Sequence, residues 1–177
     1  GILPGAPVNL QIPDGWLVTQ KGIQKVNPKD NTLLAVCPVP ILISRRLRSI
    51  DTGAEKIEIA YQRDGTWHSI TTARSTAFAT RAIIELADRG LPITSEKARH
   101  IVAYLGDLEA ANLEALPLSR SVERMGWVGA SKFIPGRAGD VVLDVPDGSE
   151  ATADAYHQHG DLDGWIQAAR AVADRWP

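Results

Sequence analysis

Arginine and lysine side chains are the residues of this sequence best suited to binding chemistry. Guanidinium groups form paired hydrogen bonds to phosphate oxygens, and nearby aromatic rings can stack on nucleic-acid bases. Arg45, Arg46 and Arg48 fall on one predicted strand, with Trp67 and Trp127 as candidate stacking rings. The alternative is that these arginines solubilise the outer face of a sheet while the tryptophans fill its core. The predicted nucleic-acid-binding set is Arg45, Arg46, Arg48, Arg74, Arg81, Arg124, Lys132 and Arg137.

Two other groups of residues would support metal binding or catalysis. His157 and His159, beside acidic residues, offer two imidazoles to zinc, but an exposed polar linker explains them better. Cys37 would need His68 or His100 as a base, and nothing in the sequence brings them together. A single cysteine in a strand is usually a small buried hydrophobe. We therefore expect no catalytic residue, no metal site and no cofactor in this chain.

The signatures of common enzymes are absent from the sequence. It has no G-x-x-x-x-G-K-S/T phosphate loop, no H-E-x-x-H, no C-x-x-C and no G-x-S-x-G. The glycines at 126, 129, 136 and 139 do not lead from a strand into a helix, so hairpin turns explain them better than a phosphate-binding nest. The expected role is binding rather than catalysis.

Composition is typical of a globular protein, with an uneven distribution of charge. The 177 residues, 44% of them hydrophobic, suffice for one domain or two small ones. No stretch approaches the roughly 18 apolar residues of a membrane span, and a single cysteine without a secretory signal favours the cytoplasm. Residues 1–139 carry 17 Lys and Arg against 13 Asp and Glu, whereas residues 140–177 carry 2 against 8. The charges of +4 and −6 are weakly compatible with an anionic partner.

The pattern of apolar residues predicts an α+β fold around an antiparallel β-meander. Asp64-Gly65 is typical of a two-residue hairpin turn. Helical spacing follows from Thr76 to Arg89, and again from Ser95 to Pro117, where Gly106 is a candidate kink. An amphipathic helix capped by Asp161 ends the chain. The predicted strands are 16–20, 23–26, 33–37 (buried), 41–50, 56–63, 66–72, 122–128, 132–134 and 141–145.

These elements divide the chain into four predicted parts. Order is expected to begin near Ile12. The parts are an arm or linker over 1–11, an antiparallel sheet plus two helices over 12–117, a β-hairpin region on the same core over 118–150, and an acidic linker with the start of a helix leading to a further, absent domain over 151–177.

Several short motifs, in this order and spacing, resemble the N-terminal region of the domain of unknown function 927 family. They include Ile12-Pro-Asp-Gly-Trp16, Arg63-Asp-Gly-Thr-Trp-His68, Leu86-Ala-Asp-Arg-Gly-Leu-Pro-Ile93, Met125-Gly-Trp-Val-Gly129 and His159-Gly-Asp-Leu-Asp-Gly-Trp165. The resemblance implies a module joined to a helicase-like P-loop ATPase of phages, plasmids and other mobile DNA, sometimes beside a primase. ATP and Mg would then bind the absent ATPase domain, and no catalytic residue of the family carries over to this chain.

Two functions remain open. The first is an accessory domain of a mobile-element replicative helicase-like ATPase that contacts DNA through Arg and Lys. The alternative is a protein-interaction or oligomerisation module of that ATPase without nucleic-acid contact, which the apolar helix around Trp165 favours. A metal-dependent nuclease using His157 and His159 is disfavoured. The expected partners are DNA, the ATPase domain and a primase, with no membrane.

Overall fold

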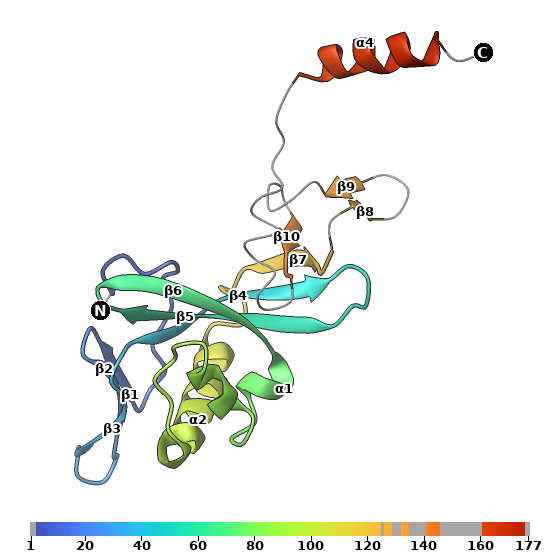
Figure 1. Ribbon diagram of the computed structural model, residues 1–177. Helices are drawn as coiled ribbons and strands as arrows, with labels where there is room; N and C mark the ends of the chain where they lie inside the picture. Colours follow the sequence, from blue (N-terminus) through green and yellow to red (C-terminus); the bar gives the residue numbers. More distant parts are fainter. Residues whose placement is uncertain (1–2, 125, 129–131, 135–140, 146–160, 176–177) are drawn as a thin grey trace. The chain divides into compact units, whose positions relative to one another are not determined.

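A computed structural model gives the fold and describes residues 3–124, 126–128, 132–134, 141–145 and 161–175. It divides into two compact units, Gly1–Ser121 and Val122–Pro177, each described below by itself. The α+β class predicted from the sequence is confirmed (Figure 1).

The predicted meander forms the main sheet of the first unit. Strands β4 (Ile41–Ser49), β5 (Glu55–Arg63) and β6 (Thr66–Ala73) are consecutive antiparallel neighbours. Asp64 and Gly65 join the last two with φ values of 52° and 76°. Positive φ at both central residues is typical of the type I′ turn, whose twist matches that of a hairpin.

The strand that follows the helices corrects one prediction. Strand β7 (Leu118–Val122) was expected within a hairpin region, but it pairs in parallel with β4, with Leu118 opposite Arg46. The Arg46 N–H donates to the carbonyl of Pro117 at 2.8 Å and begins this pairing. The main sheet is therefore mixed. Parallel neighbours need a long connection, here all of the chain between β4 and β7, so local periodicity does not reveal them.

A second sheet is formed by β1 (Trp16–Thr19), β2 (Gly22–Val26) and β3 (Leu33–Cys37), in that order and antiparallel. The predicted first hairpin is confirmed. The prediction that β3 is a buried strand is wrong for its first half, because Leu33 and Leu34 are 50% and 42% exposed. Strand β3 lies at the edge of its sheet, and only Val36 and Cys37 reach the core.

The helix predicted from Thr76 to Arg89 is wrong. The segment forms a one-turn helix α1 (Arg74–Ala77) and a separate 3-10 helix η1 (Ile83–Ala87). Ala77 and Ile83 are both fully buried. Helix α1 ends before Phe78, and the chain does not become helical again until η1 begins at Ile83. The apolar side chains are buried from these two short helices and not from one continuous helical face.

Helix α2 (Ser95–Ala111) ends earlier than Pro117, and Gly106 does not divide it. Asn112 stands at its end. The Asn112 amide donates 2.8 Å hydrogen bonds to the carbonyls of Leu108 and Gln11, and its Oδ1 accepts from the Gln11 N–H at 2.8 Å. A short polar side chain that bonds the backbone in this way competes with helix continuation.

The segment expected to be an arm packs on the core instead. Leu3 is 7% exposed and belongs to the core cluster, against which Ala6, Val8 and Leu10 also pack. The Trp67 indole donates to the carbonyl of Pro4 at 3.2 Å. These residues have no helical or strand periodicity, so the sequence did not indicate that their apolar side chains pack against the core.

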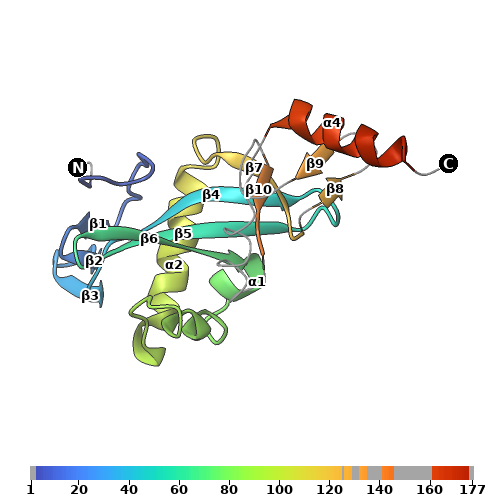
Figure 2. The same cartoon turned by 45° about the horizontal axis from the view of Figure 1, so that its top comes forward.

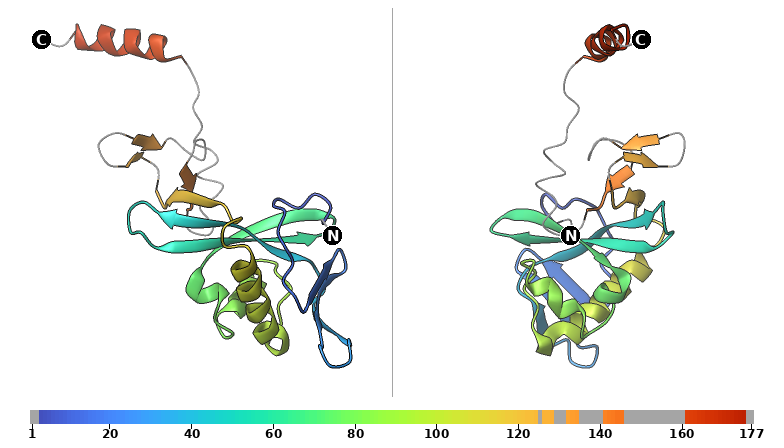
Figure 3. Two further views of the ribbon diagram at one scale, coloured as in Figure 1. Left: turned by 180° about the vertical axis from the view of Figure 1, so that it is seen from behind. Right: turned by 45° about the vertical axis from the view of Figure 1, so that its right-hand side comes forward.

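Helix α2 covers one face of the main sheet and contributes five side chains to the hydrophobic core. Its buried apolar residues belong to the same core cluster as Ile41, Ile43, Ile57 and Ile59 of β4 and β5. Figures 1 and 3 show α1 and α2 on the same side of β4–β6, and Figure 2 shows α2 crossing under these strands. The α2 residues in the cluster are Ala98, Ile101, Tyr104, Leu105 and Leu108.

The second unit contains a small hairpin, a short strand and a helix. Strands β8 (Gly126–Val128) and β9 (Lys132–Ile134) pair antiparallel, and β10 (Val141–Leu143) follows. Helix α4 (Leu162–Ala173) begins at Asp161, whose carboxylate accepts from the N–H groups of Asp163 and Gly164, which confirms the predicted cap. Among the described residues, no helix has the length and apolarity needed to cross a bilayer.

Two glycines give a matched test of the first unit. Gly22 has a φ of +114°, and a Cβ there would collide with the carbonyl oxygen of Cys37, whereas a Cβ on Gly53 (φ +71°) would meet nothing within 4 Å. Gly22→Ala should lower the free energy of unfolding by about 3 kcal/mol or more, and Gly53→Ala by about 1–2 kcal/mol. Urea denaturation measures both values, and equal losses would contradict the close approach of β2 to β3.

Candidate functional site

Two arginines of the predicted binding set, Arg45 and Arg48, pair with carboxylates where β4 meets β5. Arg45 donates from Nε and Nη2 to Glu58 Oε2 at 3.1 and 2.7 Å. The other oxygen, Glu58 Oε1, accepts from Ser44 Oγ at 2.6 Å. The side chain of Glu58 is only 14% exposed, so this pair is partly shielded from water. The fork of Arg45 is thus engaged within the fold.

Arg74 lies at the centre of a larger ion cluster. Its Nη1 and Nη2 donate to the two carboxylate oxygens of Glu109 at 2.6 and 2.8 Å, and Nη1 also contacts Glu55 Oε1 at 3.3 Å. Hydrogen bonding to Glu109 raises the pKa of Arg74. Glu55 also pairs with Arg48 at 3.3 Å, and the Arg74 guanidinium lies 4.8 Å from the Phe78 ring centroid. The cluster joins α1, α2 and β5.

The three predicted arginines of β4 do not share one face of the main sheet. Successive side chains of a strand point to opposite faces, so Arg45 faces away from Arg46 and Arg48. Arg46 is half-buried, and its Nε is the one buried side-chain nitrogen or oxygen without a hydrogen-bond partner among the described residues. Arg81 is exposed in the turn after α1.

The other predicted residues belong to the second unit. Arg124 is exposed and follows β7 in sequence, and Lys132 opens β9, where only the backbone is described. Arg137 lies outside the described residues, as do His157 and His159. Phosphate binding by the whole predicted set therefore stays a prediction.

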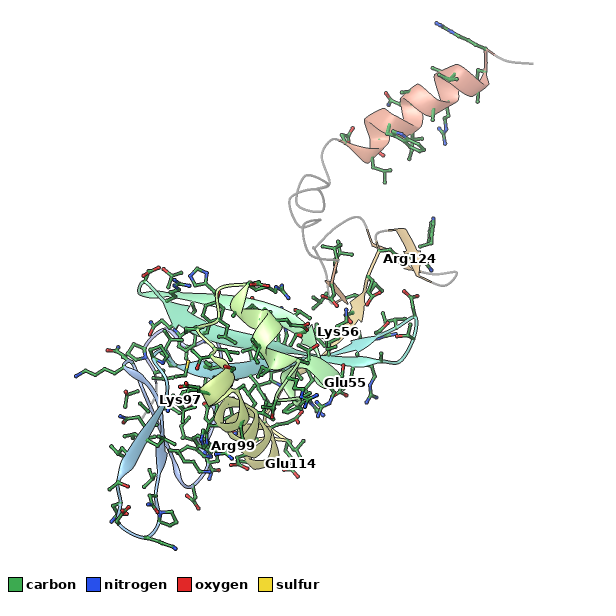
Figure 4. All side chains as sticks on the ribbon, turned by 60° about the horizontal axis from the view of Figure 1, so that its bottom comes forward. Glu55, Lys56, Lys97, Arg99, Glu114 and Arg124 are labelled. Carbon is green, nitrogen blue, oxygen red and sulfur yellow. The ribbon has the colours of Figure 1, made fainter. Side chains whose placement is uncertain are left out.

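A basic surface that the sequence analysis missed lies where α2 runs beside the smaller sheet. Partial burial and the charges of Arg99, Lys25 and Lys97 together lower the pKa of His100. Lys25 Nζ also lies 5.4 Å from the ring centroid of Trp16. Figure 4 labels Lys97 and Arg99 on α2. The Lys97-x-Arg99-His100 run was visible in the sequence, but only the fold brings Lys25 to it.

Two hollows follow one another along β3. The first, of about 400 Å³, is lined by Leu33 and Leu34 with Lys25 of β2. The second, of about 570 Å³, is lined by the last three residues of β3, by Lys21, and by the start of α2 with Lys97. Every residue of β3 thus borders one of two hollows, each with lysine at its margin.

Cys37 is a buried thiol. Burial raises its pKa to about 11, and its Sγ lies 3.7 Å from the carbonyl oxygen of Pro92, to which it donates. His68 stacks on Tyr61 with ring centroids 5.5 Å apart. The thiol is therefore mostly protonated near neutral pH, which is unfavourable for a nucleophile. No group of three potential metal ligands occurs within the described part of the chain.

Comparison with known proteins gives one finding. The model of the domain of unknown function DUF927 matches residues 13–175. The chain belongs to the DUF927 family. This confirms the resemblance inferred from the short motifs and covers nearly all of the chain. No curated protein matches it. The family description names no activity, so the surfaces of this DUF927 chain are what indicate a function.

The Arg74 cluster can be tested through Glu109. Glu109→Gln keeps the size of the side chain and removes the negative charge that Arg74 faces. The Glu109 side chain is only 11% exposed. The free energy of unfolding should fall by about 1–2 kcal/mol, since the exposed side of Arg74 moderates the loss. Urea denaturation gives the value. Glu96→Gln, at an exposed position of the same helix, is the matched control and should change stability by less than about 0.5 kcal/mol; similar losses would contradict the cluster's role.

Proposed function

We propose that this DUF927 chain is a non-catalytic accessory module of a helicase-like ATPase of mobile DNA, and that it acts by assembling copies of the protein through helix α4. Family membership supports the context, following the resemblance described above. The observation that carries the assembly role is the exposed apolar side of α4. Leu162, Trp165 and Val172 are 68%, 69% and 62% exposed, although they follow the spacing of a buried stripe.

The spacing within α4 suits pairing with a second helix. Leu162, Trp165, Ala169 and Val172 recur every three or four residues, as in the seam of a coiled coil. A helix of 12 residues is only about 18 Å long and is marginal by itself in water, so burial of this stripe would stabilise it.

Charge favours an antiparallel arrangement of the two helices. Asp161 and Asp163 lie at the start of α4, whereas Arg170 and Arg175 lie at or just beyond its end, with a single acidic residue, Asp174, between them. When the α4 helices of two copies pair in antiparallel orientation, the acidic end of each faces the basic end of the other, and their helix dipoles oppose. The proposed pair is therefore a symmetric, self-complementary contact between two copies of this chain.

Self-assembly should depend on Trp165. Light scattering behind a sizing column should show a mass that rises with protein concentration for the parent chain. Trp165→Glu places a charge in the proposed seam and should shift the dimer dissociation constant by about tenfold or more. Gln167→Glu, at an exposed position of the same helix, changes charge equally and should leave assembly intact. A monomer at all concentrations, or equal effects of the two variants, would refute assembly through α4.

DNA contact is the second candidate, and the basic surface of α2 favours it. Lys25, Lys97 and Arg99 gather around His100, whereas Arg45, Arg48 and Arg74 face carboxylates of their own fold. Phosphate would have to displace those carboxylates before binding the second set. The lysines and Arg99 are thus better placed than the arginines for contact with a nucleic-acid backbone.

Binding of a single-stranded oligonucleotide tests whether the basic surface of α2 or the arginines of β4 contact phosphate. If α2 contacts phosphate, Lys97→Glu with Arg99→Glu should weaken binding and reduce the slope of log affinity against log salt by about 0.7 per lost contact. Changing Arg45, Arg46 and Arg48 to Ala should have the smaller effect. Gel shift and fluorescence titration at several salt concentrations measure both. A larger effect of the triple change would favour the arginine site instead, and absence of binding by the parent chain would exclude both.

A further inference from the structure

We infer that the open edge of β3 is a docking strand for an extended, acidic segment of a partner protein, which it binds by adding a strand to the smaller sheet. This goes beyond the proposed function and uses a surface separate from α4, so either proposal can fail alone. Strand β3 is the last strand of its sheet, and within the described residues no backbone group pairs with its outer edge.

The hydrogen-bond pattern shows which residues face that edge. The Asn27 N–H donates to the Thr32 carbonyl at 2.9 Å. Antiparallel ladders alternate bonded and non-bonded pairs, so the pair of Lys25 with Leu34 is the next bonded one. Leu33 and Ala35 consequently point their N–H and C=O groups outward, ready to pair with an added strand.

From Leu33 to Ala35 this edge carries no charged side chain and no proline. Natural sheets commonly shield such edges with charged side chains, proline or a very short strand. Leu33, Leu34 and Ala35 are instead exposed apolar residues, and Pro38 comes only after the strand ends. The register shift opposite Ile23 and Gln24 limits regular pairing to the stretch that ends near Ala35. A short extended peptide matches this length.

The hollows explain how side chains of such a peptide would be recognised. They follow one another along β3, with Leu33 and Leu34 at the first and Ala35 to Cys37 at the second. Alternate side chains of an added strand point to the same face, so apolar ones can enter successive hollows while backbone pairing supplies affinity.

Charge selects an acidic partner. Lys25 lines the first hollow, and Lys21 and Lys97 line the second. No Asp or Glu is among the described residues that line either hollow. Carboxylates interspersed with apolar side chains would therefore complement the surface, and basic peptides would be repelled.

A labelled peptide of alternating Glu and Val, about eight residues long, serves as the probe. Fluorescence anisotropy with the full chain should show saturable binding of this peptide and at least tenfold weaker binding of the matching Lys and Val peptide. Ala35→Pro removes the outward N–H without removing a bond to β2, and should weaken binding about tenfold. Ala35→Ser keeps that N–H and should bind like the parent chain.

Hydrogen exchange gives a second readout that does not depend on how the proline variant folds. The amides of Leu33 and Ala35 should exchange at least tenfold more slowly when the acidic peptide is present, while the Trp16 and Val18 amides at the opposite edge should not change. Equal binding of both peptides, full binding by Ala35→Pro, or unchanged exchange at Leu33 and Ala35 would overturn the proposal. Binding of an oligonucleotide in place of the acidic peptide would overturn it as well.

Discussion

Burial of Tyr104 under the two sheets is the contact on which the first unit depends. The ring lies on α2, is fully buried, and donates from its hydroxyl to the Ile41 carbonyl of β4 at 2.7 Å. Its centroid is 5.2 Å from that of Trp16, in an edge-to-face arrangement that joins β1 to the same helix. Trp16 in turn donates to Asp107 at 2.8 Å. One aromatic residue thus connects the main sheet, the smaller sheet and α2.

Because these contacts fix the position of α2, they also fix where its charged side chains lie relative to the two sheets. Glu109 meets Arg74 at one end of the helix, and Lys97 and Arg99 come beside the smaller sheet near the other. Helix α2 therefore supplies the carboxylate that pairs with Arg74 and, near its other end, brings Lys97 and Arg99 close together. Carboxylates of β5 already pair with arginines of β4, so the number of arginines is a poor guide to phosphate binding. A guanidinium that is already paired must exchange one anion for another.

The accessible surface of the DUF927 chain includes two apolar regions. The outer edge of β3 and the apolar side of α4 present leucine, tryptophan and valine to water within their respective units. Exposed apolar groups of this kind are costly unless a partner covers them. For this reason we propose assembly through α4 and peptide docking at the edge of β3 as the roles of these two surfaces.

Local patterns were enough to predict several elements from the sequence. The alternation of apolar and polar residues and the Asp64-Gly65 turn predicted the β4–β6 meander. The position of Asp161 before an amphipathic run predicted the cap of α4. Both features depend on neighbouring residues alone. The family was recognisable from the order of short motifs. The candidate surfaces were predicted less well: the exposed apolar helix was recognised, but the ion pairs of Arg45 and Arg74 were not.

Tertiary packing decided the rest. The parallel pairing of β7 with β4, the burial of Leu3, the end of α2 at Asn112 and the gathering of Lys25 with Lys97 each join residues far apart in the chain. Sequence periodicity reports which side of an element is apolar. It does not report which distant carboxylate, carbonyl or sheet edge that element will meet, because those contacts exist only after the chain has folded.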